Sequence, residues 1–465
     1  MSSETTTTMR DQPSPPGTDA RTNPNRTLKK AVLTAFFGFA IDVFDLFLPI
    51  IILMPASIYF RPPQLVSPVL DSFIFAVALL GRPAGALCFG YFADRLGRKR
   101  TATLTMSGLG ACVLLTGLLP GYQTIGMLSL AGLLGLRFLT GFFAGGQYTG
   151  AVTLAMEACP RNRRGFYGGL IGAASNLSYI VMSGLGLLLF SLLPPNGIDS
   201  AYVQWGWRIP FFIGALLAFG FHRYVTREVE ESQRWLDARG KPEGERHTFA
   251  KLFSGMQAGK LLQGFVLMNG VWLVYLVPGA IMPTMLRGML HLDSSQVTSI
   301  MLASTVITFF GYLLGGAVSD RIGRRAAFVL FAIVAGTLGS YLLYLLACLS
   351  ADRFGTALAI AATAFFTAGL VWGSGPHAYL NERFHTGNRS SGYGIAFSFA
   401  IILPSFYGLY QRWLDAWFPA HVTPALLYVV ANLVVVVSAL AGPETFRANN
   451  LDDQGPFPFS AGLPD

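Results

Sequence analysis

The chain has 465 residues, of which 52% are apolar and only 12% are charged. Soluble proteins carry about 25% charged residues, so this composition excludes a soluble multidomain protein, and the apolar content excludes a disordered chain. The net charge is +9, from 33 Lys and Arg residues against 24 Asp and Glu residues. A net positive charge can indicate nucleic-acid binding, and the positions of the Lys and Arg residues test that interpretation. The surplus apolar surface requires a lipid bilayer as partner.

Twelve apolar stretches approach or exceed the roughly 20 residues that a helix needs to cross a membrane. They lie at 31–56, 70–92, 102–119, 125–156, 166–193, 209–225, 261–286, 297–318, 327–349, 354–381, 393–416 and 423–441. The first is too long for a cleaved signal, and eleven more follow it. We therefore predict an all-α membrane protein with twelve transmembrane helices.

The polar segments divide these spans into two sets of six. A tail at 1–28 is rich in Ser, Thr and Pro and is expected to be disordered. A charged central loop at 226–260 separates six-helix bundles at 29–225 and 261–441. The remaining residues, 442–465, form a second tail.

Most Lys and Arg residues fall on one side of this arrangement. They lie in the amino-terminal tail, in the loops after the second, fourth and eighth spans, in the central loop and around Arg383, Arg389 and Arg447. Because Lys and Arg in short loops mark the inner side, both termini are expected in the cytoplasm, with the protein in the plasma (inner) membrane. The net charge then reflects topology, and no nucleic-acid partner is expected.

Two of these loops repeat one sequence 226 residues apart. The first reads Gly-Tyr-Phe-Ala-Asp-Arg-Leu-Gly-Arg-Lys over 90–99, and the second reads Gly-Ala-Val-Ser-Asp-Arg-Ile-Gly-Arg-Arg over 316–325. Each follows the second span of its half, which predicts two pseudo-symmetric six-helix bundles. The acids can receive a helix dipole and the arginines can bind carboxylates, so these loops are candidate latches between rocking halves. The alternative is that the cations only set topology.

Further motifs extend this pattern. They are Arg82-Pro-Ala-Gly85, Arg137 with Gly141, Gly-Gly-Gln-Tyr-Thr-Gly-Ala at 145–151, Glu157 with Pro160, Arg-Arg-Gly-Phe-Tyr-Gly at 163–168, and Trp207-Arg-Ile-Pro-Phe211. With the paired loops, they make the chain over about 30–445 resemble the major facilitator superfamily, and within it the metabolite:proton symporter family and its sialate/lactate-type relatives. This resemblance implies import of a small organic acid or zwitterion with a proton. Gln147 stands where these families usually have a glutamate, and it cannot carry a proton.

On the repeat and the resemblance together, the candidate gating residues are Asp94, Arg95, Arg98, Glu157, Asp320, Arg321 and Arg324.

Asp42, Asp45, Arg82 and Gln147 are expected near the middle of the membrane, counting from the ends of their spans. An ionisable group at that depth costs about 2.5–3.5 kcal/mol on insertion scales, so a function is expected. We predict that Asp42 or Asp45 carries the transported proton, while Arg82 grips a substrate carboxylate. The spacing does not choose between the two acids, and a static Asp–Arg pair joining two helices is the alternative. Arg137 is read equally as structural and as a substrate contact.

Other candidate substrate contacts are polar or aromatic residues at helical spacing. They are Asn176 and Tyr179 in the fifth span, Asn269, Trp272 and Tyr275 in the seventh, and Trp372 in the tenth. Helix packing is the competing explanation for each aromatic residue. His377 lies nearer the cytoplasm, and packing is favoured over a proton-transfer role.

The chain carries no P-loop motif and no evident hydrolytic triad, so ATP-driven transport and enzymatic activity are not expected. The four cysteines are widely spaced, which predicts neither disulfides nor a metal site. The prediction is a monomeric secondary transporter that binds a small organic anion or zwitterion and needs no cofactor beyond the proton gradient. The alternatives are a proton-coupled exporter and a non-transporting sensor with this fold.

Overall fold

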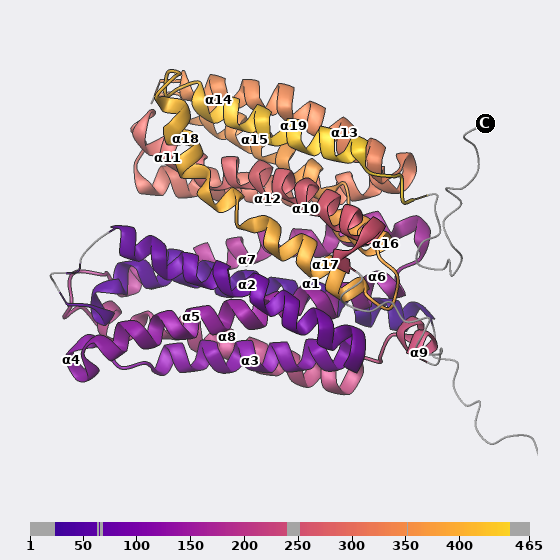
Figure 1. The fold of residues 1–465 in the computed structure, drawn as a ribbon. Helices are drawn as coiled ribbons and strands as arrows, with labels where there is room; N and C mark the ends of the chain where they lie inside the picture. The colour runs from indigo at the N-terminus through magenta and orange to yellow at the C-terminus, as the bar shows by residue number, and fades with distance from the viewer. Residues whose placement is uncertain (1–23, 63–64, 66–67, 240–251, 351, 447–465) are drawn as a thin grey trace, which may run out of the picture.

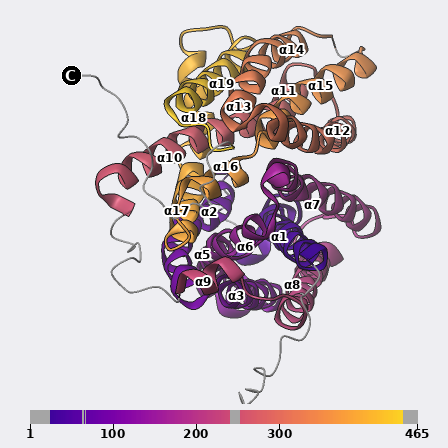
Figure 2. The same cartoon turned by 90° about the vertical axis from the view of Figure 1, so that its right-hand side faces the viewer.

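The computed structural model describes residues 24–62, 65, 68–239, 252–350 and 352–446, and this part of the chain contains helices and no strand. Twelve of its helical segments are long and apolar enough to cross a membrane, which confirms the number of spans predicted. They run along one axis in two bundles that lie side by side (Figure 1). Figure 2 shows the same two bundles nearly end-on. Three parts of the expected polar segments lie outside the described residues: 1–23 of the tail expected at 1–28, 240–251 of the loop expected at 226–260, and 447–465 of the tail expected at 442–465.

We call the first bundle the N-bundle. Its elements are α1 (Pro24–Phe47), η1 (Leu48–Leu53), η2 (Met54–Phe60), α2 (Pro68–Leu96), α3 (Arg98–Leu118), α4 (Tyr122–Ile125), α5 (Met127–Gln147), η4 (Tyr148–Val152), α6 (Thr153–Ala158), η5 (Arg161–Arg163), α7 (Arg164–Leu192), η6 (Tyr202–Gly206) and α8 (Arg208–Glu228). The short helix α9 (Gln233–Arg239) follows it.

We call the second bundle the C-bundle. Its elements are α10 (Gly255–Leu276), η9 (Val277–Ile281), α11 (Met282–Gly288), α12 (Ser294–Ile322), α13 (Arg324–Val334), η10 (Ala335–Gly339), α14 (Ser340–Ala347), α15 (Phe354–Gly373), α16 (Pro376–Arg383), α17 (Arg389–Ser398), η11 (Phe399–Ile401), η12 (Pro404–Phe406), α18 (Tyr407–Asp415) and α19 (Thr423–Ala441).

Helix boundaries differ from expectation around the polar segments. α1 already begins at Pro24, so residues 24–28 are helical rather than part of a disordered tail. Proline suits the first turn of a helix because it has no N–H to leave unpaired. The segment expected as one loop at 226–260 contains the end of α8, the helix α9 and the start of α10.

Corresponding helix pairs in the two bundles pack through glycine. A Cβ atom on Gly85 in α2 would collide with the backbone of Phe142 in α5. The equivalent pair in the C-bundle is α12 and α15, where a Cβ on Gly311, 226 residues after Gly85, would lie 2.9 Å from the backbone oxygen of Phe366. Without a hydrophobic driving force in lipid, helices associate through such close backbone contact. The same device at matching positions supports the duplication inferred from the loops.

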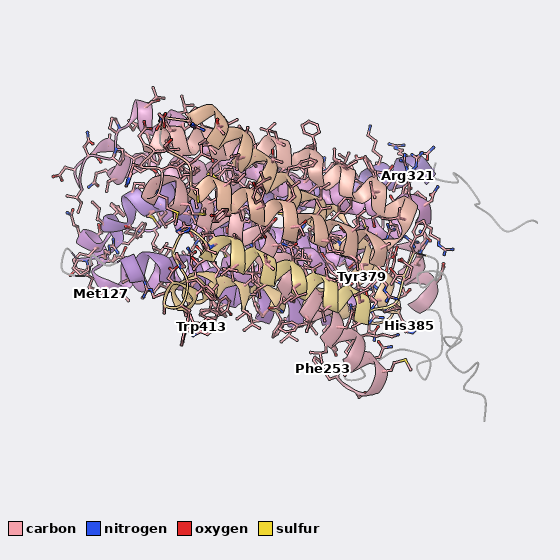
Figure 3. The ribbon with its side chains drawn as sticks, turned by 90° about the horizontal axis from the view of Figure 1, so that it is seen from above. Met127, Phe253, Arg321, Tyr379, His385 and Trp413 are labelled. Carbon is pink, nitrogen blue, oxygen red and sulfur yellow. The ribbon has the colours of Figure 1, made fainter. Side chains whose placement is uncertain are left out.

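The repeated loops lie at one end of both bundles, which we call the basic end. There α2 meets α3 at Gly97 (φ 111°) and α12 meets α13 at Gly323 (φ 98°). This backbone conformation favours glycine, which explains the second glycine of the repeat. Figure 3 shows Arg321 and His385 at this end and Met127 near the opposite one.

Candidate functional site

Asp42 and Arg82 form a buried ion pair between α1 and α2. Arg82 Nη2 lies 3.0 Å from Asp42 Oδ1 and Arg82 Nη1 lies 3.2 Å from Asp42 Oδ2, a bidentate arrangement. Tyr148, in the η4 segment of the fourth span, donates a 2.5 Å hydrogen bond to Asp42 Oδ2 and also contacts Arg82 Nη1. Asp42 is fully buried and Arg82 is 3% exposed. The three side chains form one charge-balanced group, which we call the Arg82 site.

The second acid of α1 has a guanidinium of its own. Asp45 Oδ1 lies 3.3 Å from both Nη1 and Nη2 of Arg137 in α5. Arg137 is fully buried in the N-bundle, where its guanidinium also lies over the ring of Phe211. The expected cluster of two acids around Arg82 is therefore two separate ion pairs, because Arg137 lies within reach of Asp45.

Aromatic side chains of the C-bundle gather opposite the Arg82 site. The rings of Trp272 and Trp372 meet edge to face at 4.8 Å, and Tyr275 lies 6.1 Å from Trp372. Phe397 of α17 contacts Trp272 at 5.5 Å and Tyr148 of the N-bundle at 4.9 Å. The predicted aromatic residues thus reach the Arg82 site through Phe397, which the sequence reasoning did not identify.

Two other predicted contacts, Gln147 and Asn269, form their hydrogen bonds away from the Arg82 site. Gln147 accepts a hydrogen bond from Thr105 and packs against Gly38, so it lies inside the N-bundle rather than toward the C-bundle. The next residue, Tyr148, lies at the Arg82 site, where Gln147 was expected. Asn269 donates to the carbonyl of Phe265, one turn back on its own helix.

Tyr179 packs edge to face on Phe47 of α1, with ring centroids 5.1 Å apart. Asn176, on the same helix, is fully buried, and neither of its amide atoms has a hydrogen-bond partner among the described residues.

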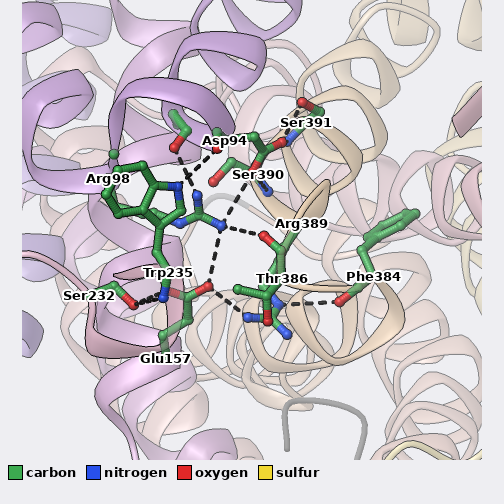
Figure 4. A network of polar contacts seen from close by, with 12 residues as sticks. Asp94, Arg98, Glu157, Ser232, Trp235, Phe384, Thr386, Arg389, Ser390 and Ser391 are labelled. Atoms are coloured by element: carbon green, nitrogen blue, oxygen red, sulfur yellow. Dashed lines mark hydrogen bonds and ion pairs between the residues drawn. The ribbon is translucent and has the colours of Figure 1, made fainter. Parts of the chain in front are cut away.

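At the basic end, Asp94 of α2 caps a helix of the other bundle. Its carboxylate accepts hydrogen bonds from the backbone N–H groups of Ser390 and Ser391 at 3.2 and 3.0 Å, and from Ser391 Oγ at 2.6 Å (Figure 4). These residues open α17, so the carboxylate meets the positive end of that helix. The contact is a polar link between the bundles.

A charge network adjoins this cap. Arg98 Nη2 lies 3.3 Å from Asp94, 3.5 Å from Glu157 and 2.6 Å from the carbonyl oxygen of Thr386 (Figure 4). Glu157 also accepts a 2.6 Å bond from Arg389 of the C-bundle. One buried glutamate therefore binds an arginine from each bundle.

The second copy of the repeated loop makes the reciprocal cap. Asp320 of α12 accepts hydrogen bonds at 2.7 Å from the backbone N–H groups of Gly165 and Phe166, in the first turn of α7. Gly316, the first glycine of this copy, leaves room for the backbone of Gly165. The two copies thus bind the two bundles to each other in both directions.

Glu382 completes the reciprocal network. It lies 3.3 Å from Arg324 of its own bundle and 3.9 Å from Arg164 of the N-bundle. The sequence reasoning identified Glu157 but missed Glu382 and Arg389. Their spacing could have revealed them, because Arg164 follows Glu157 by seven residues and Arg389 follows Glu382 by seven.

Two further glutamates cap the repeat and were also missed. Glu231 accepts from the N–H groups of Arg98 and Lys99 at the start of α3, at 2.9 and 3.1 Å. Glu444 accepts from Arg324 and Arg325 at the start of α13, at 2.9 and 3.0 Å.

Two predicted gating residues lie on the surface instead. Arg95 and Arg321 are exposed, and Arg95 lies over the ring of Tyr91. Within the described residues, these two do not join the inter-bundle networks above.

Comparisons with known proteins agree with this architecture. A family model described as the Major Facilitator Superfamily matches residues 31–400. A citrate-proton symporter of Klebsiella pneumoniae is 28% identical over 327 residues, which cover 70% of this chain and 71% of that protein. A citrate-proton symporter of Salmonella typhi is 30% identical over 309 residues, covering 66% and 69%.

A proline/betaine transporter of Escherichia coli (strain K12) is 27% identical over 428 residues, covering 89% of this chain and 76% of that protein. Among solved structures, the proton:xylose symporter XylE bound to 6-bromo-6-deoxy-D-glucose superposes with a TM-score of 0.72. It is 18% identical, over 90% of this chain and 95% of that one, and shares the fold.

Proposed function

Because the chain belongs to the Major Facilitator Superfamily and is a proton-coupled secondary transporter, we propose that it imports a small organic acid together with a proton. In this proposal the basic end faces the cytoplasm and the protein lies in the inner membrane, as the Lys and Arg bias favours. The observation that carries the proposal is the bidentate Arg82–Asp42 pair beside the inter-bundle aromatic residues.

The coupling follows from competition for one guanidinium. An ionised Asp42 occupies the fork formed by Nη1 and Nη2 of Arg82. A proton that binds Asp42 removes its charge and frees the fork of Arg82 for the carboxylate of the substrate, which makes the same two hydrogen bonds. Arg82 is then charge-balanced both in the empty and in the loaded site. An unpaired buried charge is strongly unfavourable. The bundles are therefore not expected to change conformation when only the proton or only the substrate is bound.

Alternating access supplies the movement. Halves of such transporters rock around a central site, so that it opens to one side at a time. The Asp94 and Asp320 caps and the Glu157–Arg389 pair hold the basic end of the two bundles together. Opening of that end requires these contacts to break.

The test is uptake by purified protein in proteoliposomes with an imposed inward proton gradient. We expect accumulation of radiolabelled organic acid that a protonophore abolishes. Asp42→Asn should abolish gradient-driven accumulation and retain exchange of internal for external substrate, because the exchange needs no net proton movement. Normal accumulation by Asp42→Asn would refute the coupling role.

Arg82→Lys tests the grip on the substrate. Lys keeps the charge but cannot donate two parallel hydrogen bonds to a carboxylate. A lost hydrogen bond to a charged group costs about 1.5–3 kcal/mol, so the dissociation constant should rise roughly 10- to 150-fold. Arg137→Lys is the matched control, since it also alters a buried arginine paired to α1, and it should leave the affinity unchanged. Wild-type affinity in a folded Arg82→Lys protein would contradict the role of Arg82.

A further inference from the structure

His377 lies where the tenth span is interrupted, and one of its ring nitrogens faces the other bundle. α15 ends at Gly373 and α16 begins at Pro376, with Gly375 between them at φ 102°. The imidazole is 1% exposed, and its Nδ1 lies 2.8 Å from the hydroxyl of Tyr393. Its Nε2 has no hydrogen-bond partner among the described residues. A Cβ atom built on Gly172 of α7 would lie 3.6 Å from this Nε2, so the nitrogen points across the interface.

Asn176 is a buried amide on the N-bundle helix that His377 faces. It follows Gly172 by one helical turn, so both residues share one face of α7. Asn176 is fully buried, and both its Oδ1 and its Nδ2 lack a partner in the described part of the chain. Buried polar groups without partners are costly and rare. A polar ligand that binds between the bundles would satisfy these two groups on facing helices.

This pair is separated from the Arg82 site by a layer of aromatic rings. Phe39 of α1 lies 5.5 Å from the ring of Tyr148 and 5.7 Å from that of His377. Phe397 of the C-bundle bridges the same two rings at 4.9 and 5.3 Å. Phe39 and Phe397 therefore contact both the Arg82 site and His377, and a compact ligand that joined the two would lie with its carbon skeleton against these rings.

We propose that His377 and Asn176 bind a second oxygen-bearing group of the substrate whose carboxylate is held by Arg82. This inference rests on the proposed function and narrows its substrate class to hydroxy acids and di- or tricarboxylic acids. Both side chains are hydrogen-bonding groups, and His377 stands in the first turn of α16, where backbone N–H groups carry a partial positive charge that favours oxygen anions. Simple monocarboxylates and methylated betaines present no second oxygen group to this pair.

Two substitutions separate recognition from a merely structural role. In His377→Gln the amide nitrogen reaches the position of Nε2 but the bond to Tyr393 is lost. In His377→Asn the amide nitrogen replaces Nδ1 and keeps the Tyr393 bond, but the side chain is too short to replace Nε2. Recognition through Nε2 predicts that Gln is the better substitute, whereas a structural role through Tyr393 predicts that Asn is.

The experiment measures gradient-driven uptake of malate, citrate, propionate and glycine betaine by proteoliposomes. For malate or citrate we expect His377→Asn to raise KM roughly tenfold and His377→Gln to raise it much less, in keeping with the loss of a hydrogen bond to an oxygen anion. The matched controls are His222→Asn and His222→Gln. His222 lies within the N-bundle, 2.7 Å from Ser107 Oγ, and neither change should alter KM.

The outcomes distinguish this inference from the function on which it rests. Uptake of propionate or glycine betaine at the rate and KM of malate would overturn the inference and leave proton-coupled transport standing. A larger KM for His377→Gln than for His377→Asn would also overturn it. Uptake of none of the four compounds by folded wild-type protein would count against both the inference and the proposed import of organic acids.

Discussion

Two acids three residues apart on α1 have different surroundings, and the difference separates their roles. Asp42 pairs with Arg82 and Tyr148, and the ring of Tyr148 contacts the C-bundle through Phe397. Asp45 pairs with Arg137 inside the N-bundle. Of these two pairs, the Asp42 pair is the one that contacts the C-bundle among the described residues, which favours Asp42 over Asp45 as the proposed proton carrier.

Asp45→Asn tests this division. The substitution leaves the buried guanidinium of Arg137 without its counter-charge, and breaking one side of a buried pair costs about 3–5 kcal/mol. We expect a clearly lower melting temperature for Asp45→Asn, with proton-driven accumulation retained in the folded fraction. Replacing both partners, as Asp45→Asn with Arg137→Gln, should recover part of the loss. If Asp45→Asn lost coupling but kept a normal melting temperature, the proton carrier would be Asp45 and not Asp42.

At the scale of elements, the repeated loops act through helix ends. Asp94 caps α17 and Asp320 caps α7, so each acid contacts the positive end of a helix from the other bundle. Glu157 and Glu382 each bind one arginine of the N-bundle and one arginine of the C-bundle. Both kinds of contact lie at the basic end, away from the Arg82 site.

Asp94→Asn and Asp320→Asn should therefore weaken closure of the basic end without weakening substrate binding. A carboxylate at a helix N-terminus contributes about 0.3–1 kcal/mol, and up to about 2 kcal/mol when partly buried. We expect the population open at the basic end to rise about 2- to 30-fold. Spin labels at the exposed positions 100 and 325 would report this as a longer distance between the labels.

The control for these variants is Asp237→Asn, which changes an exposed acid of α9. It should leave the distance distribution unchanged. A substantial loss of substrate affinity in Asp94→Asn, with an unchanged distance distribution, would contradict the role of a latch.

At the scale of the whole molecule, the position of one native cysteine tests the orientation. Cys348 is exposed and follows α14, at the end opposite the repeated loops, whereas Cys112 and Cys159 are buried. If the basic end faces the cytoplasm, a membrane-impermeant maleimide should label Cys348 on intact cells, and Cys348→Ser should abolish that labelling.

Asp237→Cys in the Cys348→Ser background should label only after the cells are made permeable, because α9 follows the N-bundle at the basic end. The reverse pattern of labelling would invert the topology and, with it, the side on which the Asp94 and Asp320 caps close.

The sequence by itself determined the features that depend on local composition and on repetition. Twelve apolar stretches specify twelve spans because a bilayer imposes a length on every crossing helix. The repeats at 90–99 and 316–325 specify a duplicated unit because the same residues recur at the same place in each set of six spans. Arg82 and the two acids of α1 could be placed in one layer because depth follows from the helical rise.

Only the tertiary structure decided which groups meet. Asp42 and Asp45 lie nearly level on one helix, but their partners come from α2 and α5, and the packing of those helices assigns Arg82 to one acid and Arg137 to the other. The same packing directs Gln147 into the N-bundle and its neighbour Tyr148 toward the Arg82 site. Successive residues of a helix point about 100° apart, so a motif specifies its residues but not the one that faces the partner bundle.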